Sequence, residues 1–181
     1  MEVKLLDYTD NWQKVKNCAM NTIGKEEGGY PSSAWKTKIL LAEHSPIRQL
    51  KFTIRFYDLP YWVSVHFVRH KVGVEHYVST QRTDRTGKAE RGSQSALVTH
   101  TMDINAQAMI AISRKRLCYK ASPETRQAWE KAVLAFSILE PELMSVCVPE
   151  CVYRGMCPEM QSCGRNVAEW RGEYEQLRSM D

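Results

Sequence analysis

The sequence predicts a single α+β domain, and three observations lead to this fold class. Two short segments, residues 51–57 and 72–79, alternate apolar and polar side chains with the period of a β-strand. Two longer segments, 96–120 and 123–140, are rich in residues that favour helices. The 181-residue chain has no internal repeat or linker that would divide it, and 43% of its residues are hydrophobic, enough for one core.

The first third of the chain predicts one strand and two helices. The strand covers residues 3–6 and is followed by Asp10, whose side chain can accept backbone amide hydrogens at the start of a helix. Ser32, after Pro31, marks the start of a second helix, which ends before the His-Ser-Pro turn. The apolar residues that share a face are Trp12, Val15 and Ala19 in the first helix and Trp35, Ile39 and Leu40 in the second.

The middle of the chain predicts two strands with an ambiguous segment between them. The strand at 51–57 turns three apolar side chains to one side and is broken by residues 58–60. Residues 61–71 fit both a strand and a helix, and a helix would align Trp62, Val65, His66 and Arg69. The second strand, 72–79, places Glu75, Tyr77 and Ser79 opposite Val72, Val74 and Val78.

The second half of the chain predicts three helices. Residues 96–120 contain no Gly or Pro and read as one long helix, with Asn105 and Arg116 on the same narrow stripe. Ser122 caps the next helix, which runs to about Glu140 and is closed by Pro141. A Cys-rich segment, 147–163, precedes a final helix within 164–181.

Charge and hydropathy limit the possible function classes. The net charge is +4, too small an excess to imply a nucleic-acid-binding protein by itself. The polar stretch from Arg82 to Arg91 carries four cations, which suits either phosphate binding or an ordinary solvated loop. Neither an apolar run of about 18 residues nor a secretory signal is present, so we expect a soluble cytoplasmic protein.

The six cysteines allow two interpretations. Without an export signal, a disulfide framework is disfavoured because the cytosol keeps thiols reduced. Four of them could ligate zinc or an iron–sulfur centre, namely Cys147, Cys151, Cys157 and Cys163. Their spacing contains no two-residue knuckle, so reduced, partly buried thiols are the alternative.

A motif at the start of the second strand resembles the signature of flavin-dependent thymidylate synthases. That signature is Arg, His, Arg, seven residues and Ser, and this chain has Arg69, His70, Lys71, seven residues and Ser79. Further segments resemble the family in the same order: VKLLDYT, the HSP turn before FTIRF, LPYWVSVHFVRH, NAQAM and SRKRLC. The tail CVYRGMCPEMQSCG is similar to the cysteine-bearing tails of some members.

The resemblance implies a fold, a reaction and an assembly. The fold is that of thymidylate synthase complementing proteins, a central, mostly antiparallel sheet flanked by long helices. In the reaction, dUMP receives a one-carbon unit from methylenetetrahydrofolate and becomes dTMP, while FAD reduced by NADPH supplies the hydride. Family members are homotetramers that hold the flavin between subunits.

The resemblance also assigns site residues. The reaction requires a cation where negative charge develops on the pyrimidine, and Arg116 matches the family arginine, although an arginine at a helix end also stabilises the helix dipole. Ser79 joins it in the catalytic set as a nucleotide-holding residue rather than a covalent nucleophile, because no general base is identifiable beside it. The substrate-binding set is His66, Arg69, Tyr77, Ser79, Arg82, Arg91 and Arg116. The cofactor-binding set is Arg69, His70, Lys71, Glu75, Asn105 and Lys120.

Several positions depart from the family pattern. Lys71 replaces an arginine, His66 replaces a glutamine, and His76 and Tyr77 replace Asn and Glu in the spacer. Arg82 lies one place later than the family arginine. These changes leave two alternatives open: the same fold and flavin with hydroxymethylation or another pyrimidine nucleotide, or a noncatalytic module that binds nucleotides or nucleic acid.

Overall fold

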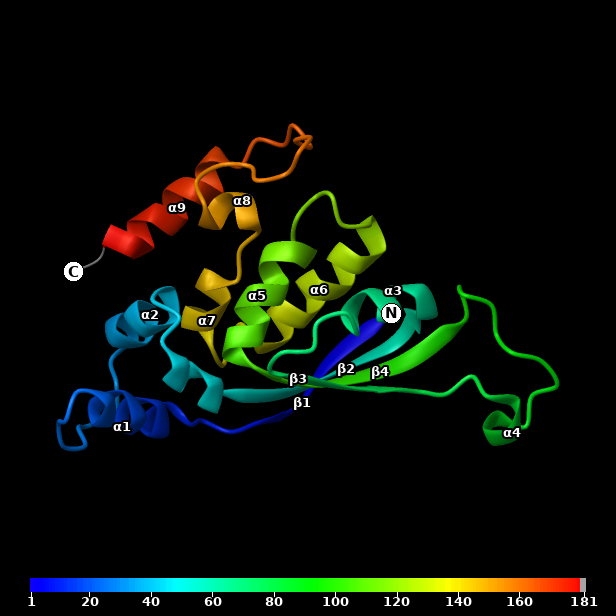
Figure 1. The fold of residues 1–181 in the computed structure, drawn as a ribbon, viewed down its shortest axis with the longest axis horizontal. Coiled ribbons are helices and arrows are strands. Elements are labelled where there is room, and N and C mark those ends of the chain that lie inside the picture. Colours follow the sequence, from blue (N-terminus) through cyan, green and yellow to red (C-terminus); the bar gives the residue numbers. More distant parts are fainter. Residues whose placement is uncertain (180–181) are drawn as a thin grey trace.

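The fold is built on a four-stranded antiparallel sheet, and helices cover one face of this sheet (Figure 1). The computed structural model describes residues 1–179. The strands are β1 (Glu2–Tyr8), β2 (Lys51–Pro60), β3 (Val74–Val78) and β4 (Leu97–Asn105), in the order β1-β2-β4-β3 with each neighbouring pair antiparallel. The helices are α1 (Trp12–Thr22), α2 (Ser33–Leu41), the 3₁₀ helix η1 (Ser45–Gln49), α3 (Tyr61–Phe67), α4 (Thr83–Thr86), α5 (Ala106–Arg116), α6 (Pro123–Phe136), α7 (Pro141–Val146), α8 (Glu150–Tyr153) and α9 (Ala168–Ser179).

The three predicted helix starts near Asp10, Ser32 and Ser122 are confirmed, and at each one a polar side chain accepts an early backbone amide. Asp10 Oδ1 accepts the backbone N–H of Trp12 at 3.0 Å, and Ser32 Oγ accepts that of Trp35 at 3.3 Å. Ser122 likewise accepts the N–H of Thr125 at the start of α6. Each bond satisfies an amide that the helix itself leaves without a partner.

The prediction of one long helix over 96–120 is wrong. Residues 97–105 form β4, and the helix α5 begins only at Ala106. In β4 the buried residues Val98, His100, Met102 and Ile104 alternate with more exposed ones, which is the period of a strand. Pairing with β2 and β3 on its two edges then outweighs the helix propensity of the segment.

Other element boundaries also differ from the predictions. β2 continues to Pro60 across a bulge at Asp58, whose φ of 52° lies in the left-handed region. The ambiguous segment forms the helix α3 only as far as Phe67. Val72 lies before β3 and is 88% exposed, so it does not share the buried face of Val74.

The core lies between the sheet and the helices. In Figure 1, α3, α5 and α6 lie along one face of the sheet. Large side chains that fill this layer include Phe52, Phe56, Phe67, Trp129 and Phe136. The opposite face of the sheet bears polar side chains, and the connection from β3 to β4 extends away from the body with the short helix α4 near its tip.

Two further boundaries affect the C-terminal half. α6 ends at Phe136, and Pro141 begins α7 instead of closing the preceding helix. The final helix begins at Ala168, after a connection without regular structure. None of the helices described between residues 1 and 179 has the length and apolar content needed to cross a membrane.

Candidate functional site

Arg116 is held at the end of α5 by two neutral acceptors. Its Nε–H donates to His70 Nε2 at 2.9 Å, and its Nη2 donates to the backbone oxygen of His66 at 2.7 Å. Within residues 1–179 no carboxylate forms an ion pair with it. Burial and the nearby charge of Arg69 lower the pKa of Arg116, but a guanidinium stays protonated in proteins. The site therefore contains a half-buried positive charge that no anion among the described residues neutralises.

His70 is a neutral imidazole in this arrangement. Burial and the charge of Arg116 lower the pKa of His70 to about 4. Because its Nε2 accepts the Arg116 N–H, the ring proton is on Nδ1. Nδ1 makes no hydrogen bond to the part of the chain that the structure describes, so this N–H can donate to a ligand.

Two further histidines, His76 and His100, are linked to His70 by hydrogen bonds. His76 Nε2 is 2.7 Å from the backbone oxygen of His70, and His76 Nδ1 is 3.0 Å from His100 Nε2. Sequence reasoning noted His76 only as a departure from the family pattern. It missed His100, because that residue lay inside the helix wrongly predicted for 96–120.

A second group of predicted residues meets at the base of the β3–β4 connection. Ser79, Arg82 and Arg91 line a cavity of about 380 Å³ that also includes Tyr61 and Gln81. Ser79 Oγ accepts the N–H of Thr99 at 3.0 Å, which leaves its hydroxyl hydrogen free for a ligand. β3 ends at Val78, so the strand no longer determines on which side Arg82 lies.

The cations of this cavity differ in their availability. Arg82 donates to both carboxylate oxygens of Asp84, at 3.0 and 2.7 Å. Arg91 has no ion pair with any residue of the described chain. Gln81 Nε2 is buried and makes no hydrogen bond to the described protein. Neither Gln81 nor Tyr61 was predicted as a site residue: Gln81 stands where the family pattern expects an arginine, and Tyr61 lies outside the signature.

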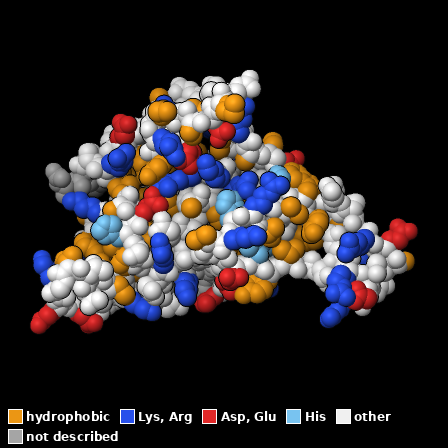
Figure 2. Space-filling model, in the orientation of Figure 1, with side chains coloured by type: hydrophobic (Ala, Val, Ile, Leu, Met, Phe, Trp, Pro, Cys, Tyr) orange, Lys and Arg blue, Asp and Glu red, His pale blue; other side chains and the backbone are white. Residues whose placement is uncertain are grey.

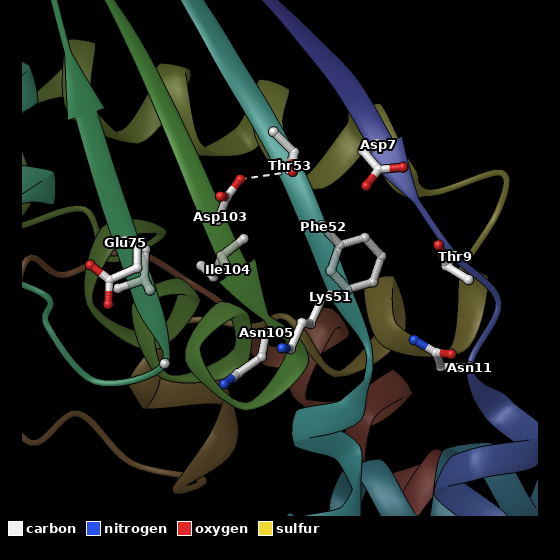
Figure 3. Close-up of a pocket in the computed structure, with 12 residues that line it drawn as sticks. Asp7, Thr9, Asn11, Lys51, Phe52, Thr53, Glu75, Asp103, Ile104 and Asn105 are labelled. Atoms are coloured by element: carbon white, nitrogen blue, oxygen red, sulfur yellow. Dashed lines mark hydrogen bonds between the residues drawn. The ribbon is translucent and has the colours of Figure 1, made fainter.

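Two predicted cofactor residues lie instead on the open face of the sheet. Glu75 and Asn105 line a polar cavity of about 570 Å³, together with Asp103 and Lys51 (Figure 3). Asn105 is not a mid-helix residue as predicted, because it caps α5 and its Oδ1 accepts the N–H of Ala108 at 2.9 Å. This cap gives Asn105 a structural role that does not require a ligand.

The remaining predicted residues are dispersed. Arg69 and Lys71 are exposed beside His70, and Tyr77 is 58% exposed on β3. Lys120 lines a small cavity next to several cysteines rather than the surroundings of Arg116. Figure 2 shows Lys and Arg side chains gathered around His side chains in the middle of one face.

The structure does not form the predicted four-cysteine metal site. Cys147 lies in the core, where burial raises the pKa of its thiol to about 12. The other three predicted ligands line the small cavity of Lys120 together with Cys118. Nowhere in residues 1–179 are three or more His, Cys, Asp or Glu side chains placed to hold a metal ion. None of the six cysteines, all of which lie within residues 1–179, forms a disulfide.

Comparison with known proteins gives a fold but no sequence family. No protein-family model and no curated protein matches the chain. Among solved structures, the flavin-dependent thymidylate synthase ThyX from Helicobacter pylori, complexed with FAD and dUMP, superposes with a TM-score of 0.68 at 14% identity. That match covers 82% of this chain and 100% of the ThyX chain. A second structure of the same enzyme with FAD and dUMP gives 0.67 at 14% identity, over 82% and 99% of the two chains.

A third similar structure is a UMP/dUMP methylase, PolB from Streptomyces cacaoi, bound with 5-Br dUMP. It has a TM-score of 0.64 and 14% identity over 80% of this chain and 93% of that chain. The fold of this chain is therefore the ThyX fold.

Proposed function

We propose that this protein is a flavin-dependent enzyme that transfers a one-carbon unit to C5 of a uracil nucleotide, in the simplest case converting dUMP to dTMP. The ThyX fold supports the proposal, because two similar structures hold FAD and dUMP. The observation that carries it is the guanidinium of Arg116, which is half-buried, bound by neutral acceptors and paired with no described carboxylate.

Arg116 has the properties needed to stabilise charge on a pyrimidine. C5 of uracil is a poor nucleophile, and negative charge on the ring carbonyl oxygens makes it a better one. A fixed cation in a partly desolvated site stabilises that charge more strongly than water does. Two of the five N–H groups of the side chain bond to His70 and His66, and the others remain available to donate. The bonds that are made fix the plane of the guanidinium.

The cavity at the base of the β3–β4 connection is proposed to bind the nucleotide phosphate. Arg91 supplies a cation without a protein partner, and Gln81 supplies a buried N–H donor that no described acceptor uses. The Ser79 hydroxyl adds a third donor. Arg82 contributes only when it leaves Asp84.

The residues around His70 fit a flavin dinucleotide. Arg69 and Lys71 are exposed and have no carboxylate partner among residues 1–179, which suits the phosphates of FAD. The Nδ1–H of His70 can donate to a ring carbonyl. When bound, the flavin would receive a hydride from NADPH and deliver it to the one-carbon unit carried over from methylenetetrahydrofolate. Arg69, His70 and Lys71 would hold and orient the flavin. We further propose that the protein is a cytoplasmic homotetramer and that neighbouring subunits complete the site.

Departures at the site favour a second candidate, a different product on the same ring. His66 and Tyr77 replace a glutamine and a glutamate, and one similar structure is a methylase named for both UMP and dUMP. This candidate retains the role of Arg116 and changes the nucleotide or makes hydroxymethyl the added group. Mass spectrometry separates the products, since methyl and hydroxymethyl differ by one oxygen atom.

The test combines flavin binding with a substitution at Arg116. We expect purified protein to bind FAD, and to oxidise NADPH in the presence of dUMP and methylenetetrahydrofolate. Arg116→Gln should lower turnover by about 100-fold or more, the usual effect of removing a group that stabilises transition-state charge. The matched control is Lys115→Gln, because Lys115 adjoins Arg116, is exposed and, among the described residues, forms an ion pair with Glu150 alone.

Two results would contradict the proposal. One is full turnover in Arg116→Gln. The other is wild-type protein that neither binds FAD nor oxidises NADPH; if such protein binds an oligonucleotide, the noncatalytic alternative is correct.

A further inference from the structure

A chain of hydrogen bonds runs from the core of the molecule to Arg116. It begins at His100 on β4, which is 0% exposed, and passes to His76 on β3 through the 3.0 Å contact. It continues from His76 to the backbone oxygen of His70 at 2.7 Å, and from the His70 ring to Arg116 at 2.9 Å. Neither His76 nor His100 belongs to the signature, and the proposed chemistry does not use them.

The acceptors determine where each proton lies. A carbonyl oxygen only accepts, so His76 carries its proton on Nε2. If the His76 ring is neutral, its Nδ1 has no proton and acts as an acceptor. The proton in the bond between His76 and His100 therefore comes from His100 Nε2. The opposite direction would require a cationic His76 and would leave a buried N–H of His100 without an acceptor. Orphaned buried donors are rarer than orphaned acceptors, which favours the neutral chain.

Burying a histidine at position 100 costs free energy, so its presence there suggests that its hydrogen bond to His76 has a function. Its neighbours on the same face of β4 are apolar, and its ring lies about 6 Å from those of Phe56 and Phe67. Its Nδ1 has no partner in the described protein, and burial lowers the pKa of His100 to about 4. An aliphatic side chain would fill this position without an unpaired nitrogen.

Hydrogen bonds hold both peptide groups that flank the Cα of His70. The N–H of His70 donates to the oxygen of Phe67 at 2.9 Å, and its carbonyl accepts from His76. With the backbone fixed, only the side-chain torsions of His70 remain to set the direction of Nε2, which faces Arg116. A change at His76 would therefore alter the bond that orients the guanidinium.

We propose that His76 and His100 are positioning residues for Arg116, acting through the peptide and ring of His70. This inference rests on the proposed function, in which Arg116 stabilises charge on the pyrimidine. It adds that the orientation of Arg116 is set from inside the sheet, by two residues of β3 and β4.

The first test needs no substitution. Long-range ¹H–¹⁵N spectra of the histidine rings of the full-length protein at neutral pH should show His76 and His100 protonated on Nε2 and His70 protonated on Nδ1. A proton on Nδ1 of His76 would overturn the proposal.

The second test compares two variants with a matched control. His76→Leu should speed solvent exchange of the Arg116 Nε–H at least about tenfold, as expected when a hydrogen bond of ordinary strength is lost. His76→Gln retains a donor and an acceptor and should restore slow exchange. His44→Leu is the control, because His44 is exposed and outside the chain of hydrogen bonds. Unchanged exchange in His76→Leu overturns the proposal.

Turnover separates this inference from the proposed function. In an active enzyme, His76→Leu should lower kcat about tenfold or more with a smaller effect on KM, because misplaced charge affects the transition state most. His76→Gln should recover most of that loss, which a merely structural role would not predict. If exchange at Arg116 responds as expected while wild-type protein shows no flavin-dependent turnover, the positioning role is supported and the proposed function fails.

Discussion

At the residue scale, one buried carboxylate outside the signature accepts hydrogen bonds from two other elements. Glu140 is 1% exposed, in the connection between α6 and α7. Trp12 Nε1 donates to both of its oxygens at 2.9 Å, and the hydroxyl of Tyr8 also donates to it. Burial raises the pKa of Glu140 and that of Tyr8. The Glu140 side chain thus connects β1 and α1 to the segment between α6 and α7 by hydrogen bonds.

We predict that Glu140→Ala lowers the free energy of unfolding by about 2–4 kcal/mol, because it leaves a buried donor of Trp12 and a half-buried donor of Tyr8 without an acceptor. Glu140→Gln should cost about half as much, since its amide oxygen can still accept from Trp12. Urea denaturation measures both. Glu90→Ala, in an exposed loop, serves as the control and should change stability by less than about 0.5 kcal/mol. Equal effects at 90 and 140 would refute the role of Glu140.

Single residues also show how far the sequence allows a site to be predicted. Arg116, His70 and His66 were chosen from the resemblance, and the structure brings them into contact. His100 could not be chosen, because its importance depends on a neighbour in another strand. Whether Glu75 and Lys120 act at the site is still a prediction, and both lie in cavities separate from the one that contains Ser79.

At the element scale, the junction of β4 and α5 was the hardest part to predict. Residues 51–57 carry apolar side chains at every second position, and a strand was predicted here correctly, although it continues to Pro60. In β4 the same alternation is interrupted by His100, and no Gly or Pro separates the strand from the helix. Asn105 is both the last residue of β4 and the N-cap of α5. No turn residues therefore lie between the strand and the helix to mark the boundary in the sequence.

A close backbone approach supports this junction. Gly73 has a φ of 73°, and its carbonyl accepts the N–H of Asn105 at 3.0 Å. A Cβ on Gly73 would lie 2.5 Å from Nδ2 of Asn105. The position therefore requires glycine both for its backbone conformation and for space.

We predict that Gly73→Ala lowers the free energy of unfolding by about 2–4 kcal/mol, combining left-handed backbone strain with displacement of the Asn105 cap. Gly87→Ala is the matched control, because Gly87 has a φ of 67° but nothing within 4 Å of its Cβ position. Its cost should be about 1–2 kcal/mol, from backbone strain alone. If urea denaturation gave the two variants equal stability, the steric part of the argument would be incorrect.

At the scale of the whole molecule, stability should depend on the neutral histidines between the sheet and Arg116. The pKa values of His70 and His100 are lowered from 6.5 to about 4, mainly by burial. Between pH 6.5 and about 4, these two histidines bind protons in the unfolded chain but not in the folded chain. The free energy of unfolding therefore falls as pH decreases through this window, by up to about 1.4 kcal/mol per pH unit for each histidine. Glu140, whose pKa is raised in the fold, has the opposite sign and offsets part of the loss near the lower end.

We predict a progressive loss of stability in urea denaturation as the pH is lowered from 6.5 towards 4, the window set by the two histidines. His100→Met removes one of them and should reduce the slope by up to about half, because His70 and also His66, whose pKa burial lowers, still contribute in the same direction. His44→Leu should retain the full slope, because His44 is exposed and bonds to neither ring. A slope that persists unchanged in His100→Met would mean that His100 does not exclude a proton from the folded state. The fixed tautomers on which the orientation of Arg116 depends would then have no basis, so this stability measurement is a further, independent check on the hydrogen-bond chain.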